Sequence, residues 1–162
     1  MIRPVAPDDV PAIVRIYNHY ILGSTATFET EPLDLVSMAC RIATTSVCYP
    51  YIIYVDPDGR LLGYAYAHRW KDRAAYASTW ETSVYVAPEA CGRGIGRKLM
   101  LRLVKLCREA GAKALIACIT AENTASCALH ERLGFRKVSH FVGVGEKLGR
   151  RLDVVDYELL LK

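Results

Sequence analysis

The densest group of residues suited to chemistry is a glycine-containing segment that follows a run of β-branched and aromatic residues. Residues 83–88 read Ser-Val-Tyr-Val-Ala-Pro, and residues 91–98 read Cys-Gly-Arg-Gly-Ile-Gly-Arg-Lys. Glycines allow a backbone to approach a ligand closely, and the free N–H groups of a first helical turn attract an anion. The order strand, turn, glycines, helix therefore predicts a site for a phosphate or pyrophosphate group. The alternative is that these glycines form a tightly packed turn that binds no ligand.

Two well-known nucleotide motifs do not fit this segment. A Walker A loop requires Ser or Thr after its lysine, whereas Lys98 is followed by Leu99. A dinucleotide fingerprint requires glycine three residues after its second glycine, whereas Arg97 lies three residues after Gly94 and Leu99 three after Gly96. The next candidate strand, 114–121, also offers no acid for a ribose. The sequence thus argues against an NTPase and against a nicotinamide cofactor.

Positive charge is concentrated in and after the glycines. Seven Lys and Arg residues lie between Cys91 and Lys113, opposed by Glu109 alone, and they alternate with apolar residues at helical spacing. The distal cations fit a solvated helix face equally well, but those beside the glycines favour the anion site. They are Arg93, Arg97 and Lys98. No aromatic residues are interleaved with the run, so nucleic acid is not the expected partner.

Length and composition limit the class of protein. The 162 residues predict a single domain over 1–162, and a content of 52% hydrophobic and 23% charged residues with a net charge of +4 is that of an ordinary globular chain. We expect a cytoplasmic protein, because the sequence has neither a long apolar span nor a signal peptide. Six cysteines without C-x-x-C spacing are expected to be buried free thiols, and no histidine-cysteine spacing indicates a metal.

The periodicity of apolar residues predicts the elements that position these groups. Helices are expected from Asp8, as the cap, to about residue 22, over 33–45, after the glycines, and over 124–133. Strands are expected at 2–5, 51–55, 61–68, 79–86, 114–120, 135–142 and 154–161, and the Asp-Pro-Asp-Gly turn at 56–59 joins two of them as a hairpin. This order predicts an α/β fold with a mixed sheet and helices on both faces.

Two segments resemble the GNAT N-acetyltransferases. Residues 91–96, Cys-Gly-Arg-Gly-Ile-Gly, look like that family's pyrophosphate loop, and residues 123–135 look like its second coenzyme A segment with His130 at the usual tyrosine position. The resemblance implies a mixed, mostly antiparallel sheet and acetyl-CoA as the co-substrate. It assigns the coenzyme contacts to three groups of residues, namely Val84, Tyr85 and Val86; Gly92, Arg93, Gly94, Ile95, Gly96 and Arg97; and Asn123 and Arg132.

Further motifs are similar to those of the phosphinothricin and methionine sulfone/sulfoximine acetyltransferases. Three of them are the segments 16–20, 26–32 and 145–150. The others are single residues between these segments, namely Trp70, Lys71, Arg73, Tyr76 and Glu81. The resemblance implies transfer of an acetyl group from acetyl-CoA to the α-amino group of a small amino acid or analogue, by a cytoplasmic homodimer. Two positions depart from the pattern. Cys91 replaces a polar residue that opens the loop, and Arg151 stands where the group often has tryptophan.

The reaction needs a neutral amine, and an amino group is mostly protonated at pH 7. Glu81 is the expected base, since a carboxylate in a partly apolar cleft can have its pKa raised. His130 is the second catalytic candidate, as an acid, a base or an orienting group, with a purely structural histidine as the alternative. Backbone N–H groups of Val84 to Val86 are expected to meet the developing oxyanion.

The expected acceptor site combines cations for a carboxylate with an aromatic wall, and consists of Phe28, Lys71, Asp72, Arg73 and Tyr76. Three other functions stay open. A protein N-terminal or lysine acetyltransferase would use the acids Glu29 and Glu31, a sensor would bind acetyl-CoA without turnover, and a ping-pong enzyme would use Cys127 as its nucleophile.

Overall fold

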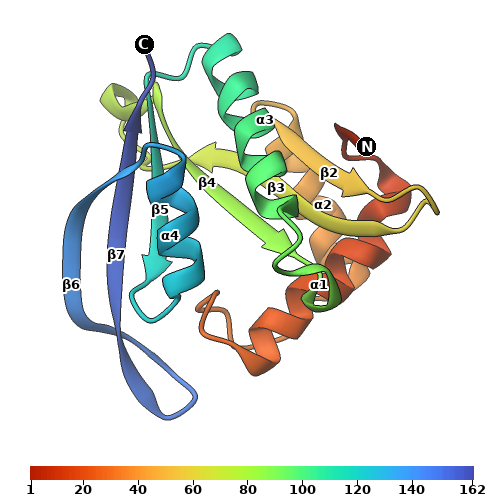
Figure 1. Cartoon of the computed structure of the whole chain (residues 1–162), viewed down its shortest axis with the longest axis horizontal. Coiled ribbons are helices and arrows are strands. Elements are labelled where there is room, and N and C mark those ends of the chain that lie inside the picture. The colour runs from red at the N-terminus through yellow and green to blue at the C-terminus, as the bar shows by residue number, and fades with distance from the viewer.

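The computed structural model describes all 162 residues, which form one seven-stranded sheet in the order β1-β2-β3-β4-β5-β7-β6 (Figure 1). The strands are β1 (Ile2–Pro4), β2 (Tyr51–Val55), β3 (Leu61–Arg69), β4 (Thr79–Val86), β5 (Ala114–Thr120), β6 (Arg136–Lys147) and β7 (Arg150–Leu160). The helices are α1 (Val10–Gly23), α2 (Leu35–Ser46), α3 (Ile95–Glu109) and α4 (Thr124–Arg132). All neighbouring strands are antiparallel except β4 and β5. The expected mixed, mostly antiparallel sheet is confirmed.

Helices cover both faces of the central strand β3, which explains why six of its nine residues are buried. Gly63 faces α3 so closely that a Cβ there would lie 3.2 Å from the Leu99 side chain. The next residue, Tyr64, points to the other face, where its ring stacks on Tyr85, and Tyr85 in turn meets Tyr17 of α1 edge to face. The core therefore has two layers, one under α3 and one under α1 and α2.

The parallel pair β4 and β5 is short. Only Thr79 to Glu81 pair with Ala114 to Ile116, and beyond Glu81 the two strands separate. Both strands continue for four or five residues without a shared hydrogen-bonded register, so a gap opens in the middle of the sheet. The amino end of α3 and the helix α4 flank this gap (Figure 1).

Strands β6 and β7 form one long hairpin, in which Lys147 pairs with Arg150. The turn residues Leu148 and Gly149 both have positive φ, 52° and 71°, as a two-residue type I′ turn requires. We expected strands over 135–142 and 154–161 with a loop between them. Those bounds were too short, because 143–151 has the composition of a loop, with three glycines and several charged residues, although residues 145–147 pair with 150–152.

Smaller expectations at the amino end also need correction. Helix α1 begins at Val10, and Asp8 does not cap it. The neighbouring carboxylate of Asp9 is the one that folds back, accepting from the Ala6 N–H at 2.7 Å and from the Arg3 guanidinium. Helix α2 begins at Leu35 because the Asp34 carboxylate accepts from the Ser37 N–H at 2.7 Å.

All six cysteines are free, as expected, but only Cys107 is fully buried. The expectation of buried thiols was wrong for Cys40, Cys48, Cys91 and Cys118, which are exposed. At Cys118 the reason is strand alternation. The apolar sequence context comes from Ala117 and Ile119, whose side chains point to the opposite face of β5.

Candidate active site

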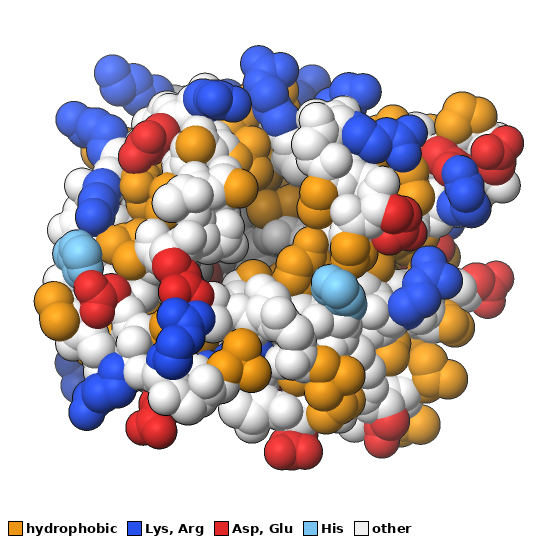
Figure 2. All heavy atoms as spheres, turned by 60° about the horizontal axis from the view of Figure 1, so that its bottom comes forward, with side chains coloured by type: hydrophobic (Ala, Val, Ile, Leu, Met, Phe, Trp, Pro, Cys, Tyr) orange, Lys and Arg blue, Asp and Glu red, His pale blue; other side chains and the backbone are white.

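The separation of β4 and β5 leaves a cleft of about 420 Å³, bounded by the carboxyl half of β4, the amino end of α3, and α4. Figure 2 shows the face on which it opens, with a hollow near the centre that contains hydrophobic side chains and with Lys and Arg side chains gathered above it. The cleft brings together all the expected coenzyme residues except Arg93, which lies exposed beside it. Its lining includes Val84, Tyr85, Val86, Gly92, Gly94, Ile95, Gly96, Arg97, Asn123 and Arg132.

The glycine segment presents a continuous series of unpaired amides. No backbone N–H from Gly92 to Arg97 donates a hydrogen bond within the protein, and the first helical bond of α3 runs from Lys98 N–H to the Gly94 carbonyl. Gly92 and Gly94 both have a φ of 76°, in the left-handed region where a side chain is strained. Six free donors at the positive end of a helix dipole suit a pyrophosphate.

On the opposite wall, β4 offers further backbone groups. Ala87 N–H donates to the Leu62 carbonyl of β3 at 2.8 Å, and hydrogen-bonding direction alternates along a strand, so the amides of Val84 and Val86 point toward the cleft. The Val86 carbonyl is already engaged by the Tyr20 hydroxyl at 2.6 Å. Val84 lies beyond the last residue of β4 that pairs with β5, so its N–H has no partner strand. This N–H is a suitable donor for a developing oxyanion.

A second, narrower cavity lies between the separated strands, where it adjoins the large cleft. It is lined by Ala26, residues 82–85 of β4, residues 117–120 of β5, and Asn123, Ser126 and His130. Asn123 caps α4, because its side-chain oxygen accepts from the Ser126 N–H at 3.2 Å. The narrow cavity, of about 60 Å³, thus borders β4, the strand that carries Glu81, and α4, the helix that carries His130.

Glu81 lies at the last residue pair that joins β4 to β5, with its side chain half-buried. Burial raises its pKa above the ordinary value of 4.5, Asp156 raises it further, and His68 opposes the shift. His68 pairs with Glu81 across β3 and β4, and its Nε2 lies 3.9 Å from the carboxylate. Glu81 therefore holds a proton more readily than an exposed glutamate, as a general base near neutrality requires.

His130 is almost completely buried, at 3% exposure, between Phe135 and Tyr157. Its Nδ1 lies 2.8 Å from the Ser126 carbonyl, which can only accept, so Nδ1 carries the hydrogen in the neutral ring. Burial lowers the pKa of His130, and the Ser126 carbonyl opposes the shift. The ring is therefore neutral at pH 7 with an unprotonated Nε2. Ser126, rather than Cys127, is the residue that forms hydrogen bonds with His130.

The expected acceptor residues fall into two groups. Residues 71–76 precede Thr79, which pairs with Ala114 at the start of β5. The Phe28 ring instead lies against Gly145 of β6, beside the other end of β5. A seven-residue strand spans roughly 20 Å, so one subunit does not bring Phe28 and the cations into contact.

Within the first group, aromatic rings hold the lysine. The Lys71 ammonium lies 4.1 Å from the centre of the Trp70 ring and 5.4 Å from that of Tyr76, and the two rings meet edge to face. Arg73 is exposed and makes no ion pair. Asp72 is fully exposed and lies 3.8 Å from Arg69, so it neutralises a neighbouring cation rather than Lys71.

The acids near Phe28 do not form an open anionic patch. The Arg41 guanidinium of α2 holds both oxygens of Glu29, at 2.7 and 3.0 Å, and this pairing lowers the pKa of Glu29. Only Glu31 is free in this segment. The hypothesis that Glu29 and Glu31 together bind a cationic protein acceptor is therefore weakened, because Arg41 already neutralises Glu29.

Sequence reasoning missed two residues of the site, Tyr20 and His68. Tyr20 falls on the apolar face of α1 and reads as core, and nothing in the sequence shows that its hydroxyl reaches Val86. His68 is placed opposite Glu81 by the register of β3 and β4, which is set by tertiary packing.

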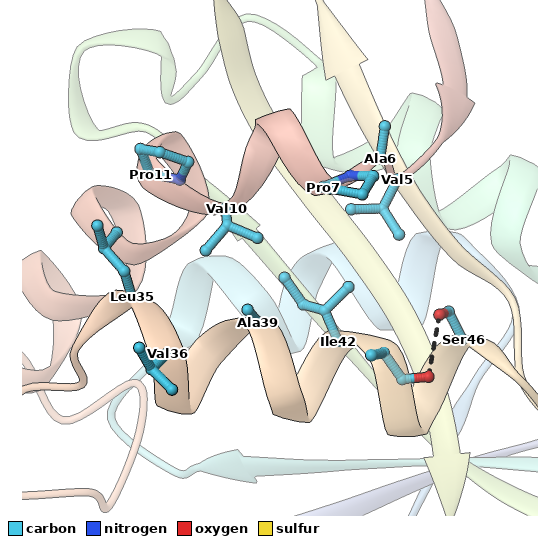
Figure 3. Close-up of a pocket in the computed structure, with 11 residues that line it drawn as sticks. Val5, Ala6, Pro7, Val10, Pro11, Leu35, Val36, Ala39, Ile42 and Ser46 are labelled. Atoms are coloured by element: carbon cyan, nitrogen blue, oxygen red, sulfur yellow. Dashed lines mark hydrogen bonds between the residues drawn. The ribbon is translucent and has the colours of Figure 1, made fainter.

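Outside this site lies an apolar groove of about 730 Å³ between the amino end of α1 and the helix α2 (Figure 3). Its lining includes Val5, Val10, Leu35, Ala39 and Ile42 and no titratable side chain. No group of three or more His, Cys, Asp or Glu side chains is arranged to hold a metal ion. None of the helices is both long and apolar enough to cross a membrane.

Comparisons with known proteins agree with this geometry. Residues 13–135 match the Acetyltransferase (GNAT) family, and the chain belongs to that family. It is 43% identical to a phosphinothricin N-acetyltransferase of Alcaligenes faecalis over 95% of this chain and 79% of the relative. It is 35% identical to an L-methionine sulfoximine/L-methionine sulfone acetyltransferase of Pseudomonas paraeruginosa over 99% of this chain and 94% of the relative.

A solved phosphinothricin acetyltransferase from Sinorhizobium meliloti, in complex with acetyl-CoA, superposes with a TM-score of 0.97. It is 36% identical, over 99% of this chain and 88% of that one. The chain is thus an acetyl-CoA-dependent N-acetyltransferase, closely related to the phosphinothricin and methionine sulfoximine/sulfone acetyltransferases.

Proposed function

We propose that this enzyme acetylates the α-amino group of a small amino acid or analogue, of the phosphinothricin, methionine sulfone or methionine sulfoximine type. The observation that carries the proposal is the single face of β4 on which Glu81, Ser83 and Tyr85 alternate, beside the point where β4 leaves β5. On that face an amine can meet a base and a thioester together. The relatives' printed substrates supply the class of acceptor.

Acetyl-CoA supplies the acetyl thioester, and the chain's own groups would orient the coenzyme and deprotonate the acceptor amine. The unpaired amides of Gly92 to Arg97 would hold the pyrophosphate, with Asn123 and Arg132 on the facing wall. The amine nitrogen attacks the thioester carbonyl carbon, the C–S bond breaks, and an amide forms. Glu81 takes the amine proton directly or through water, and the Val84 amide donates to the carbonyl oxygen.

His130 is suited to proton transfer to the leaving thiolate sulfur. A neutral imidazole with its hydrogen on Nδ1 has no proton to give from Nε2. Nε2 would first accept, through water, the second proton, which the nitrogen loses after it has attacked, and would then give that proton to the leaving thiolate sulfur, whereas Glu81 takes the first proton, which turns the ammonium into the neutral amine. Its burial in the narrow cavity keeps it close to the reacting atoms and away from bulk solvent.

The acceptor would lie along the Glu81 face. Lys71 and Arg73, with Tyr76, stand next to the Glu81 end and suit a carboxylate. Phe28 lies at the Tyr85 end of the same face, because the preceding residue, Thr27, forms a hydrogen bond with Tyr17, and Tyr17 packs against Tyr85. Because the cations and Phe28 lie at opposite ends of a strand that spans roughly 20 Å, a small amino acid would contact one group at a time, and the substitutions Arg73→Ala and Phe28→Ala distinguish the two arrangements.

A homodimer is also part of the proposal. Strand β6 is the edge of the sheet, and it exposes an apolar patch that consists of Val138, Phe141, Val142 and Val144, each at least 49% exposed. An edge strand with exposed apolar side chains favours pairing with a second chain. Sedimentation of the wild type and of Val142→Glu tests this. We expect a dimer that the charge dissociates, and a wild-type monomer at micromolar concentration would refute it.

An acetyl-CoA turnover screen that reads the released thiol tests the acceptor class. The panel comprises phosphinothricin, methionine sulfone, methionine sulfoximine, the protein amino acids, their decarboxylated amines, polyamines and peptides. We expect fast turnover of α-amino acids and little of the matching amines. Equal or faster turnover of peptides would instead support a protein acetyltransferase, and binding of acetyl-CoA without turnover of any acceptor would support a sensor.

A further inference from the structure

Lys147, near the tip of the β6–β7 hairpin, is a buried cation that the chemistry above does not use. It is 4% exposed, and no carboxylate lies within ion-pair distance of its ammonium. The ammonium donates instead to two backbone carbonyls, Thr27 at 2.7 Å and Tyr20 at 3.4 Å. The charge of Glu29 acts on this ammonium, but Glu29 lies beyond ion-pair distance and is held by Arg41. The two carbonyls are therefore the direct partners that offset the cost of burying the charge.

Both contacts hold residues that border the active site. Tyr20 lies in the last turn of α1, where carbonyls lack helical partners, and its own hydroxyl donates to the Val86 carbonyl in the cleft. Thr27 is half of a buried pair with the Tyr17 hydroxyl, at 3.0 Å, and its carbonyl precedes Phe28. One ammonium therefore fixes the wall of the coenzyme cleft to the segment that carries Phe28.

Gly145, two residues earlier on the same strand, holds the next residue of that segment. A Cβ built on Gly145 would overlap three atoms of the Phe28 ring, so the ring lies directly on the backbone of β6. Residues at i and i+2 of a strand share a face, and Gly145 and Lys147 accordingly contact the consecutive residues Phe28 and Thr27.

The base of the same segment is fixed separately. The Thr25 carbonyl accepts from the Thr120 hydroxyl at the end of β5, and the Thr25 hydroxyl donates to Glu122 at 2.6 Å. Arg150, across the hairpin turn, holds both oxygens of Glu122 at 3.0 Å. The 25–28 segment is thus attached to the hairpin and to β5 at every residue except Ala26, which lines the cleft.

We propose that Lys147 and Gly145 are positioning residues for acceptor binding, which act by holding Thr27 and Phe28 at the acceptor end of the cleft. This inference rests on the proposed role of Phe28 in the acceptor site. The hairpin then determines acceptor specificity without touching the acceptor, and the acceptor wall moves when the hairpin's inner face changes.

The first test compares Lys147→Met, which keeps the length but loses the donors, with Lys147→Arg, which keeps the charge and the donors. Lys105→Met, on the exposed side of α3, is the matched control. We expect Lys147→Met to raise the acceptor KM roughly 10- to 100-fold with a much smaller change in the KM for acetyl-CoA, since displacing a positioned group by about 1 Å can cost that much. Lys147→Arg should recover much of the loss, and Lys105→Met should resemble the wild type.

A double-mutant cycle keeps the proposal testable if Lys147→Met does not fold. Gly145→Ala should displace the Phe28 ring and raise the acceptor KM, whereas in a Phe28→Ala background the added methyl has room and should have almost no further effect. Additive effects of the two substitutions would refute the role of Gly145. An equal rise in both KM values for Lys147→Met, or no rise, would refute that of Lys147.

Failure of the proposed function gives a different result. If Phe28→Ala alone leaves acceptor kinetics unchanged, Phe28 is not part of the acceptor site. If Phe28→Ala raises the acceptor KM but Gly145→Ala and Lys147→Met do not, the acceptor site is correct and the positioning inference is wrong.

Discussion

Gly94 offers the sharpest test of the anion site, because its conformation and its surroundings separate fold effects from ligand effects. Its φ of 76° strains any side chain, at a cost of roughly 1–2 kcal/mol, but a Cβ there would meet no protein atom within 4 Å. A fold with about 5–15 kcal/mol of stability tolerates this cost. Gly94→Val should therefore still fold, with its side chain at the mouth of the cleft.

The expected loss of affinity follows from the amides. Hydrogen bonds to a charged group contribute about 1.5–3 kcal/mol each, so obstructing two of the six free donors between Gly92 and Arg97 should cost about 3–6 kcal/mol. At 1.4 kcal/mol per factor of ten, the Kd for acetyl-CoA should rise about 10²- to 10⁴-fold. Titration calorimetry measures this directly.

Gly59 provides a matched control, since its φ is 82° and a Cβ there also meets nothing within 4 Å, but it lies in the turn between β2 and β3. Gly59→Val should lower the melting temperature about as much as Gly94→Val and leave the Kd unchanged. Acetyl-pantetheine, which lacks the pyrophosphate, should lose little affinity in Gly94→Val. The reasoning fails if Gly94→Val binds acetyl-CoA as the wild type does, or if it weakens acetyl-pantetheine equally.

The remaining predictions concern the chemistry and the acceptor. Glu81→Gln should lower kcat about 10²- to 10⁴-fold while sparing acetyl-CoA affinity, and wild-type rates across pH 6 to 9 would contradict the assignment. Because the pKa of Glu81 is raised above 4.5, the base is lost as the pH falls, and the acidic limb of the wild-type rate profile should lie above that value and disappear in Glu81→Gln. Arg73→Ala should raise the acceptor KM by roughly one to two orders of magnitude with an unchanged KM for acetyl-CoA, and unaltered amino-acid kinetics would exclude the carboxylate contact.

The sequence was most informative where structure is local. The glycine segment, the hairpin turn at 56–59 and the strands at 79–86 and 114–120 follow from nearby residue types, and the structure has them with the same bounds or nearly so. The cap of α1 is a contrast. Asp8 and Asp9 are indistinguishable by type, and the choice depends on Arg3, which reaches Asp9 from β1.

What the sequence could not supply is the pairing of distant segments. The position of His68 opposite Glu81 depends on the register of β3 and β4, and the contact of Phe28 with Gly145 joins residues more than a hundred positions apart. The split of the acceptor residues has the same origin. Phe28 and Arg73 are each placed by neighbours that no local pattern identifies, so their separation became visible only in three dimensions.

The three-residue pairing of β4 with β5 has a thermodynamic consequence. The sheet consists of two halves joined along a short seam, and a coenzyme in the cleft would touch both halves and add contacts that the chain itself lacks. Binding to the folded state alone raises stability by RT ln(1 + [L]/Kd), about 2.7 kcal/mol at a hundredfold excess over Kd. Amide protons along the carboxyl half of β4 should then exchange more slowly as the concentration of acetyl-CoA rises, so the rigidity of the sheet depends on the occupancy of the cleft.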